Sequence, residues 1–255
     1  MDIDYAAATL WAGMKEKNHM PADWFGKLTL AQAYAVQLNI LKRRVAEGDQ
    51  HAGWKVGLTS QAMRKQQNVA EPCFAHLMAS GHLPSGLHIK YDSLIRPGIE
   101  NELCLTLGST LHGPNVSFDQ ALAAIATVEP ALELIEVRGD FSADKALSMA
   151  DNAQQYGFIT GKPVVYDPAV ALDKTIVNVN FNHTLVETAN GAEVMGNPVY
   201  SLMWLAGKLA EFGLSLDAGM KVMSGSFTKQ YAVAAGDTVT SHFSDFGSVE
   251  ATFER

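Results

Sequence analysis

Three glutamates lie in patterns that indicate a site for a divalent cation. If residues 99–107 form a strand, Glu100 and Glu102 point to one face and the leucines of the segment to the other. The two residues are then about 7 Å apart along the strand, and their carboxylates repel each other unless a positive charge lies between them. A second expected strand, residues 130–135, places Glu133 in an apolar stripe, where an unpaired acid is costly.

Three carboxylates without a supporting cysteine or histidine are ligands that a hard cation prefers, so the trio predicts Mg²⁺ or Mn²⁺. Such a site leaves coordination positions for water and substrate. The alternative is structural: Glu100 and Glu102 would be ordinary residues of an exposed edge strand, and Glu133 would pair with an arginine. Because a Glu-x-Glu pair is common, the spacing alone leaves both interpretations open.

A lysine flanked by glycines is the second candidate for chemistry. Lys55 lies in Gly-Trp-Lys-Val-Gly-Leu-Thr-Ser, residues 53–60, where Gly53 and Gly57 let the backbone approach another group closely. A lysine desolvated here would have a lowered pKa and could act as an acid, a base or the holder of an anion. A surface lysine in a glycine-flanked strand is the alternative.

Two more polar segments are candidates for substrate binding. Asp151 and Asn152 follow a helix-like segment, where an Asx turn is the alternative. Ser226 lies in residues 224–228, whose hydroxyls and backbone N–H groups could hold a carboxylate but lack the spacing of a phosphate loop. The eight histidines are scattered, and no Gly-x-Ser-x-Gly turn suggests a catalytic triad.

The elements that must position these residues begin with a run of helix. Thr29 and Gln32 form a capping box, and apolar residues then recur at spacings of three and four up to Gly48. This apolar stripe must pack on another part of the protein. Residues 1–50 are therefore expected to form an N-terminal helical cover.

After residue 50 the pattern becomes one of short strands and turns. Residues 177–181 alternate in polarity, and residues 220–253 are typical of strands separated by glycine turns. A short helix is expected from Ser117 to about Val128, and another begins at Asn197, whose side chain can cap it.

Composition limits the classes of protein to consider. The chain has 255 residues, of which 47% are hydrophobic and 18% charged, so it can bury a sizeable core. We expect a single α+β domain, residues 1–255, in which a mixed, mostly antiparallel sheet forms a β-rich, metal-binding body over residues 51–255.

Charge and hydropathy argue against nucleic-acid and membrane partners. Nineteen lysines and arginines face 27 acids, a net charge of −8, whereas a phosphate-binding surface needs a basic stripe. No apolar stretch approaches the roughly 20 residues of a membrane span, and residues 1–5 lack the features of a signal peptide. Cys73 and Cys104 are isolated, so neither a disulfide framework nor a thiolate metal site is expected. We expect a cytoplasmic protein.

Taken together, these segments resemble the fumarylacetoacetate hydrolase superfamily, and within it the branch of 2-keto-4-pentenoate hydratases and 4-oxalocrotonate decarboxylases. Each motif is weak alone, but all of them occur in the family's order along nearly the whole chain. The matching motifs are Lys-Val-Gly-Leu-Thr at 55–59, Ile-Glu-Asn-Glu at 99–102, Pro-Ala-Leu-Glu at 130–133, Ala-Asp-Asn-Ala at 150–153, Ala-Gly-Asp at 235–237 and Gly-Ser-Val at 247–249.

The resemblance implies a mixed β-roll or sandwich with flanking helices and an N-terminal helical cover. It also implies Mg²⁺ or Mn²⁺ on the three glutamates and a substrate with a 2-keto or 2-enol carboxylate, with Lys55 holding that carboxylate or relaying a proton. The implied catalytic residues are Lys55, Glu100, Glu102 and Glu133. The implied substrate-binding residues are Lys55, Cys73, Leu77, Asp151, Asn152 and Ser226.

Three positions depart from the motifs of this branch. Cys73 stands where many hydratases have an acid and decarboxylases tend to have an apolar residue, Ala75 stands in place of a glycine, and Asn197 replaces the usual histidine before Pro198. Residues 225–228, in contrast, resemble hydratases that act on longer dicarboxylate dienoates.

The resulting prediction is a metal-dependent hydratase that adds water to a 2-hydroxy-2,4-dienoate in the meta-cleavage catabolism of aromatic compounds. A metal-dependent 4-oxalocrotonate-type decarboxylase is the alternative, and a ligand-binding relative that has lost activity is a third possibility. The resemblance further implies a homo-oligomer, and a partner enzyme of the same pathway is a possible associate.

Overall fold

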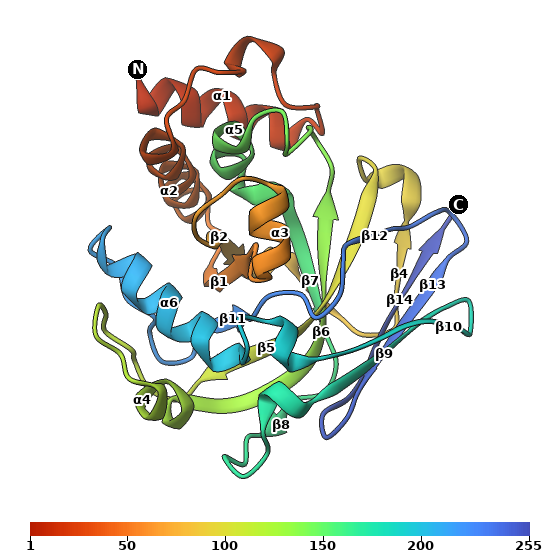
Figure 1. Cartoon of the computed structure of the whole chain (residues 1–255). Coiled ribbons are helices and arrows are strands. Elements are labelled where there is room, and N and C mark those ends of the chain that lie inside the picture. Colours follow the sequence, from red (N-terminus) through yellow and green to blue (C-terminus); the bar gives the residue numbers. More distant parts are fainter.

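All strands lie after residue 50, and in the computed structural model, which describes residues 1–255, they join into two sheets (Figure 1). The larger sheet has nine strands. Seven of them follow one another across it as β2 (Cys73–Met78), β1 (His51–Gly57), β11 (Lys221–Met223), β5 (Pro97–Leu107), β6 (Ile125–Glu136), β7 (Gln155–Thr160) and β3 (His82–Pro84). The two others are β12 (Tyr231–Ala232), paired with β5, and β8 (Val164–Val165), paired with β6.

The smaller sheet has five strands, in the order β10 (Thr184–Asn190), β9 (Ile176–Phe181), β13 (Thr238–Phe243), β14 (Gly247–Glu254) and β4 (Leu87–Lys90). Most neighbouring strands run antiparallel, whereas β1–β11, β3–β7 and β4–β14 are parallel. The expected α+β class with a mixed, mostly antiparallel sheet is therefore confirmed, as are the strands predicted at 177–181 and within 220–253.

The long central pair β5 and β6 sets the position of the glutamates. In its antiparallel register Glu100 lies opposite Glu133, and Glu102 lies opposite Ala131. Opposed residues of two paired strands share a face, as do residues two apart on one strand, so all three glutamates are on the same side of the sheet.

The other face of this pair forms the main hydrophobic core. Leu103 and Leu134 point to that side and pack with Val249 and Phe253 of the smaller sheet and with Leu205 of helix α6 (Pro198–Ala210). All five side chains are fully buried. The alternation predicted for residues 99–107 is thus confirmed: the leucines hold the sheet to its partners, and the glutamates are left for chemistry.

Helices cover the outer sides of this arrangement (Figure 1). Besides α6 they are α1 (Ile3–Lys15), α2 (Leu30–Ala46), α3 (Gln61–Gln66), α4 (Phe118–Ala123) and α5 (Lys145–Ala150). The capping box of Thr29 and Gln32 is present at the start of α2, and Asn197 caps α6 by accepting a hydrogen bond from the Val199 N–H. Both predicted helix starts are confirmed.

The N-terminal helices do not form a separate layer. Leu10 of α1 and Ile40 of α2 share a second hydrophobic cluster with Ala75 of β2 and Leu147 of α5. The cover therefore includes a helix from the middle of the chain. The boundary at residue 51 between this helical cover and the β-rich body stays a prediction.

One predicted helix is too long. The helix that starts after Ser117 ends at Ala123, and residues 125–136 form β6 instead of continuing it to Val128. The β-branched residues of this stretch favour a strand, and both β5 and β8 are available to pair with it. Pro130 is tolerated in β6 because the neighbour on one side changes there from β8 to β7. None of the six helices is long and apolar enough to cross a membrane.

Candidate metal and substrate site

The three glutamates meet at one point of the large sheet. Glu102 and Glu133 are completely buried, Glu100 is half-buried, and one carboxylate oxygen from each lies within 4.8 Å of the others. Burial raises the pKa of each, to about 7 for Glu100, and mutual repulsion adds to the effect for Glu100 and Glu102. Three acids in such a position need a positive partner to be ionised together.

The unpaired oxygens of this cluster fit a divalent cation. The Gly225 N–H donates to Glu102 Oε2 at 2.8 Å, but Glu102 Oε1 and Glu133 Oε2 accept no hydrogen bond. Buried carboxylate oxygens without donors are costly, and a cation satisfies them. Because all the available ligands are oxygens, the residues present suit Mg²⁺ or Mn²⁺.

Lys55 supplies the nearest positive charge. Its Nζ lies 3.1 Å from Glu133 Oε1, and its side chain is 5% exposed. Strands β11 and β5 separate β1 from β6 in the sheet, so this contact requires the sheet to curl. The surface-lysine alternative is thereby wrong.

The pKa expected for Lys55 must be corrected. Burial alone would lower the pKa of this lysine, as predicted, but the negative charges of Glu133 and the other acids around it outweigh burial and raise the pKa above its usual value. Lys55 is therefore a cationic donor at neutral pH and not a free base.

Gly57 makes room beside this lysine. A Cβ at position 57 would lie 2.9 Å from Cys73 Sγ and 3.3 Å from Lys55 Nζ, so only glycine leaves both side chains where they are. Register places Cys73 directly opposite Gly57 and Ala75 directly opposite Lys55. Burial raises the pKa of the Cys73 thiol to about 11, and it stays protonated at neutral pH.

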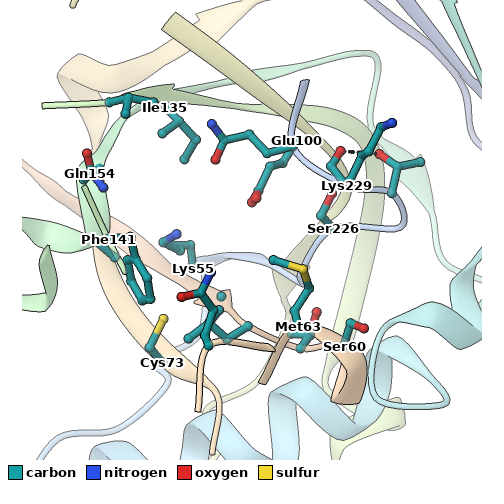
Figure 2. Close-up of a pocket in the computed structure, with 18 of the residues that line it drawn as sticks. Lys55, Ser60, Met63, Cys73, Glu100, Ile135, Phe141, Gln154, Ser226 and Lys229 are labelled. Atoms are coloured by element: carbon teal, nitrogen blue, oxygen red, sulfur yellow. Dashed lines mark hydrogen bonds between the residues drawn. The ribbon is translucent and has the colours of Figure 1, made fainter. Parts of the chain in front are cut away.

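These groups open onto a cavity of about 400 Å³. Figure 2 shows Lys55 and Glu100 facing its interior, with Cys73 at one edge. Ser226 lies on one side and Gln154 on the other. A small organic molecule has space here, beside Glu100.

Ser226 lines this cavity as predicted, but the segment around it has a different main role. Its Oγ accepts a hydrogen bond from the Asn101 N–H at 3.2 Å, and the preceding Gly225 N–H holds Glu102. The carboxylate that this segment binds is therefore one of the protein's own metal-site acids.

The structure does not bring Asp151 and Asn152 to the cavity lining. Asp151 accepts two hydrogen bonds from the buried Arg138, at 2.8 and 2.9 Å. Asn152 bonds to the backbone of His76 with both ends of its amide, at 2.9 and 3.0 Å. Both side chains are buried and engaged in holding their own segment in place.

The buried segment of Asp151 and Asn152 positions the two residues that follow it, Ala153 and Gln154. Asn152, Ala153 and Gln154 have φ values of 55°, 49° and 61°, three consecutive left-handed residues without a glycine. Such backbone is strained and persists only where its surroundings enforce it. Ala153 and Gln154 line the cavity as a result.

Leu77 and Asn197 lie outside the cavity as well. Leu77 is completely buried in a small cluster with Phe158 and Met223. The Asn197 side chain caps α6 and donates to Asp173 Oδ1 at 3.1 Å, so its departure from the family motif affects a helix start. The substrate contact expected of Leu77 finds no support in this arrangement.

Sequence reasoning missed several residues that line the cavity. They are Arg96, Phe141, Gln154 and Lys229, together with Met63 of α3. The one available signal was position: Arg96 directly precedes the strand of the first two glutamates, and Gln154 directly follows the Ala-Asp-Asn-Ala motif.

Comparison with known proteins agrees with this site and fold. The family model described as "Fumarylacetoacetate (FAA) hydrolase C-terminal" matches residues 40–254. A 4-oxalocrotonate decarboxylase of Pseudomonas sp. (strain CF600) is 37% identical over 227 residues, which cover 89% of this chain and 86% of that protein. A 2-keto-4-pentenoate hydratase of Burkholderia vietnamiensis is 33% identical over 229 residues, 89% of this chain and 87% of that protein.

A solved structure is similar over almost the entire length. It is a 4-oxalocrotonate decarboxylase from Pseudomonas putida complexed with magnesium and adipate, 34% identical, with a TM-score of 0.93 over 98% of this chain and 97% of that one. The fold implied by the motif resemblance is thus confirmed, and so is the use of divalent metals among the relatives. This chain belongs to the fumarylacetoacetate hydrolase family.

Proposed function

We propose that this protein is a divalent-metal-dependent lyase of the meta-cleavage catabolism of aromatic compounds, and that it adds water to a 2-hydroxy-2,4-dienoate of the 2-keto-4-pentenoate type. The observation that carries the proposal is the trio of Glu100, Glu102 and Glu133, of which Glu100 lines the cavity, with Lys55 beside it. Relatives named as hydratases and decarboxylases, both of them lyases, support the reaction class.

In this proposal the three glutamates hold Mg²⁺ or Mn²⁺. When bound, the cation would polarise the 2-oxygen of a 2-keto or 2-enol carboxylate and stabilise the negative charge that develops there. Lys55, charged and buried, donates hydrogen bonds to the substrate carboxylate or delivers a proton to the carbon chain.

Decarboxylation is the second candidate, and Cys73 favours it. Adding water needs a group near the far end of the diene that can move a proton, and a buried thiol with a pKa of about 11 is poorly suited to accept one. Losing CO₂ from a vinylogous keto acid needs no activated water. The 37% identical decarboxylase supports this candidate.

One experiment distinguishes the hydratase from the decarboxylase. The Mg²⁺-loaded protein is incubated in parallel with 2-hydroxypenta-2,4-dienoate and with 4-oxalocrotonate, and hydrated product and CO₂ are measured. Hydrated product supports the hydratase, and CO₂ without hydration supports the decarboxylase. The absence of both, in a protein that still binds Mg²⁺, would support a ligand-binding relative without activity.

We also propose a cytoplasmic homo-oligomer, which a partner enzyme of the same pathway could contact. Strand β10 supports self-association: it is an edge strand of the smaller sheet and exposes Leu185 and Val186. Light scattering tests this, because a mass near the 27.5 kDa of one chain would contradict it.

A further inference from the structure

One wall of the cavity is a segment that bulges out of the large sheet. Strands β11 and β12 both pair with β5, but β11 ends at Met223 and β12 begins at Tyr231. The residues between them, 224–230, are called the wall segment below. Figure 2 shows its Ser226 and Lys229 together on one side of the cavity, near Glu100.

The wall segment also holds one of the three glutamates. The Gly225 N–H donates to Glu102 Oε2 at 2.8 Å, and Gly225 has a φ of 110°, a conformation that favours glycine. A donor to a ligating carboxylate fixes the orientation of that ligand, and losing such a donor weakens metal binding. The position of the wall segment therefore affects the metal site as well as the cavity.

Asn101 is the residue of β5 that holds the wall segment. Its backbone N–H donates to Ser226 Oγ at 3.2 Å, and its carbonyl oxygen accepts from the Phe227 N–H at 2.8 Å. Its side-chain Nδ2 donates to Thr228 Oγ1 at 2.8 Å. The backbone bonds are open to any residue except proline, but the bond to Thr228 depends on the amide of Asn101.

The smaller sheet fixes the other end of this amide. Ser241 of β13 donates through its Oγ to Asn101 Oδ1, and both side chains are completely buried. Asn101 lies opposite Leu132 on the core face of β5, away from the three glutamates, and neither Asn101 nor Ser241 lines the cavity. A buried amide is costly unless it is hydrogen-bonded, and here both ends are bonded, which holds it in one orientation.

We propose that Asn101 is a positioning residue for the metal site and the cavity: supported by Ser241, it holds Thr228 and so keeps the Gly225 N–H on Glu102. This inference rests on the proposed function and adds to it a residue that contacts neither metal nor substrate. The core around position 101 would accept an apolar side chain, so stability alone gives no reason for a buried amide there.

Asn101→Leu tests the proposal, because leucine has a similar size and makes neither side-chain hydrogen bond. Mg²⁺ binding to the chelator-treated protein is measured by calorimetry, and kcat and KM are measured in saturating Mg²⁺. We expect Mg²⁺ to bind about tenfold more weakly or worse, the usual scale for losing a group that orients a metal ligand. KM should rise more than kcat falls, because the wall segment shifts while Lys55 stays in place.

Two buried serines provide a matched pair of variants. Ser241→Ala removes the support of Asn101 from outside the site and should weaken Mg²⁺ binding and raise KM, each about threefold. Ser201→Ala makes the same chemical change at another completely buried serine, whose Oγ donates to the Pro198 carbonyl oxygen within α6. It should lower the urea midpoint to a similar extent and leave Mg²⁺ affinity and KM unchanged.

The outcomes distinguish this inference from the function on which it rests. Unchanged Mg²⁺ affinity and KM in folded Asn101→Leu would overturn the inference alone. Equal effects of Ser241→Ala and Ser201→Ala would also overturn it, since the cause would then be a general loosening of the core. If Asn101→Leu does not fold, this serine comparison decides the matter. If the parent protein binds no Mg²⁺, the proposed function fails, and the inference fails with it.

Discussion

Lys55 Nζ lies 3.1 Å from Glu133 Oε1, and both side chains are buried. The lysine therefore compensates part of the negative charge of the three glutamates, while Glu102 Oε1 and Glu133 Oε2 have no donor. It also lies beside Cys73 at the cavity, next to the position where a substrate carboxylate would meet the metal site. One contact thus joins the glutamate cluster to the lining of the cavity.

Removing Lys55 should affect catalysis more than folding. Lys55→Ala is expected to reduce kcat by roughly 100-fold or more, the usual scale for losing a proton-transfer group. Circular dichroism in saturating Mg²⁺ checks the fold, because the substitution also removes the positive charge that compensates the buried Glu133. A variant with normal kcat would exclude Lys55 from the reaction.

Substitutions at Cys73 distinguish the hydratase from the decarboxylase. Cys73→Ala should change the rate little, because the protonated thiol is not a base at neutral pH. Cys73→Asp restores the acid found in hydratases of the family and should raise the rate of hydration. If Cys73→Asp shows no hydration while the parent protein releases CO₂ from 4-oxalocrotonate, the decarboxylase candidate stands and the hydratase is wrong.

A methyl group at position 57 should disturb the same residues without touching the core. In Gly57→Ala the new Cβ would lie 2.9 Å from Cys73 Sγ and 3.3 Å from Lys55 Nζ, so both flexible side chains must shift. We expect at least a tenfold loss of kcat/KM with little change in the midpoint of urea unfolding. An equal loss of stability and activity would instead indicate a general packing defect.

His76 should make the fold sensitive to acid. It is completely buried, neither ring nitrogen has a partner, and burial, with smaller contributions from Arg44 and His51, lowers its pKa well below the usual value. Below about pH 6.5 the unfolded chain therefore binds a proton that the folded chain does not bind. The contribution of His76 to the free energy of unfolding is thus fully present above that pH and decreases below it.

The free energy of unfolding should fall between pH 6.5 and pH 5, with a slope of at most about 1.36 kcal/mol per pH unit for one group. Urea unfolding at the two pH values measures it. His76→Gln keeps a similar polar volume and should show a smaller loss over the same interval. An identical pH dependence in parent and variant would rule out His76 as its source.

Strand faces and helix starts depend on local sequence pattern, and they were predicted correctly. Alternation along residues 99–107 was enough to place Glu100 and Glu102 on one face, and side-chain capping was enough to start the helices after Thr29 and Asn197. The end of the helix after Ser117 was missed because the pairing partners of β6 come from distant parts of the chain.

The direction of the Lys55 pKa shift and the place of Gln154 in the cavity wall could not be predicted from local sequence. The sign of the Lys55 pKa shift depends on Glu133, which is separated from Lys55 by two intervening strands of a sheet whose curl is not visible in either segment. Gln154 reaches the cavity through a left-handed turn that Arg138 and His76 enforce from outside it. Asn152 is a residue type that tolerates a left-handed conformation, but no residue type or spacing indicates that Ala153 and Gln154 adopt it as well.

The central claim, that Glu100, Glu102 and Glu133 bind the catalytic divalent cation, is tested most directly by titrating Mg²⁺ or Mn²⁺ into chelator-treated protein and assaying lyase activity in the same samples. We predict one site per chain, no activity before metal is added, recovery of activity in step with occupancy, and at least 100-fold weaker binding in Glu133→Gln. Full activity in the metal-free protein, or unchanged metal affinity in the folded Glu133→Gln variant, would contradict the account.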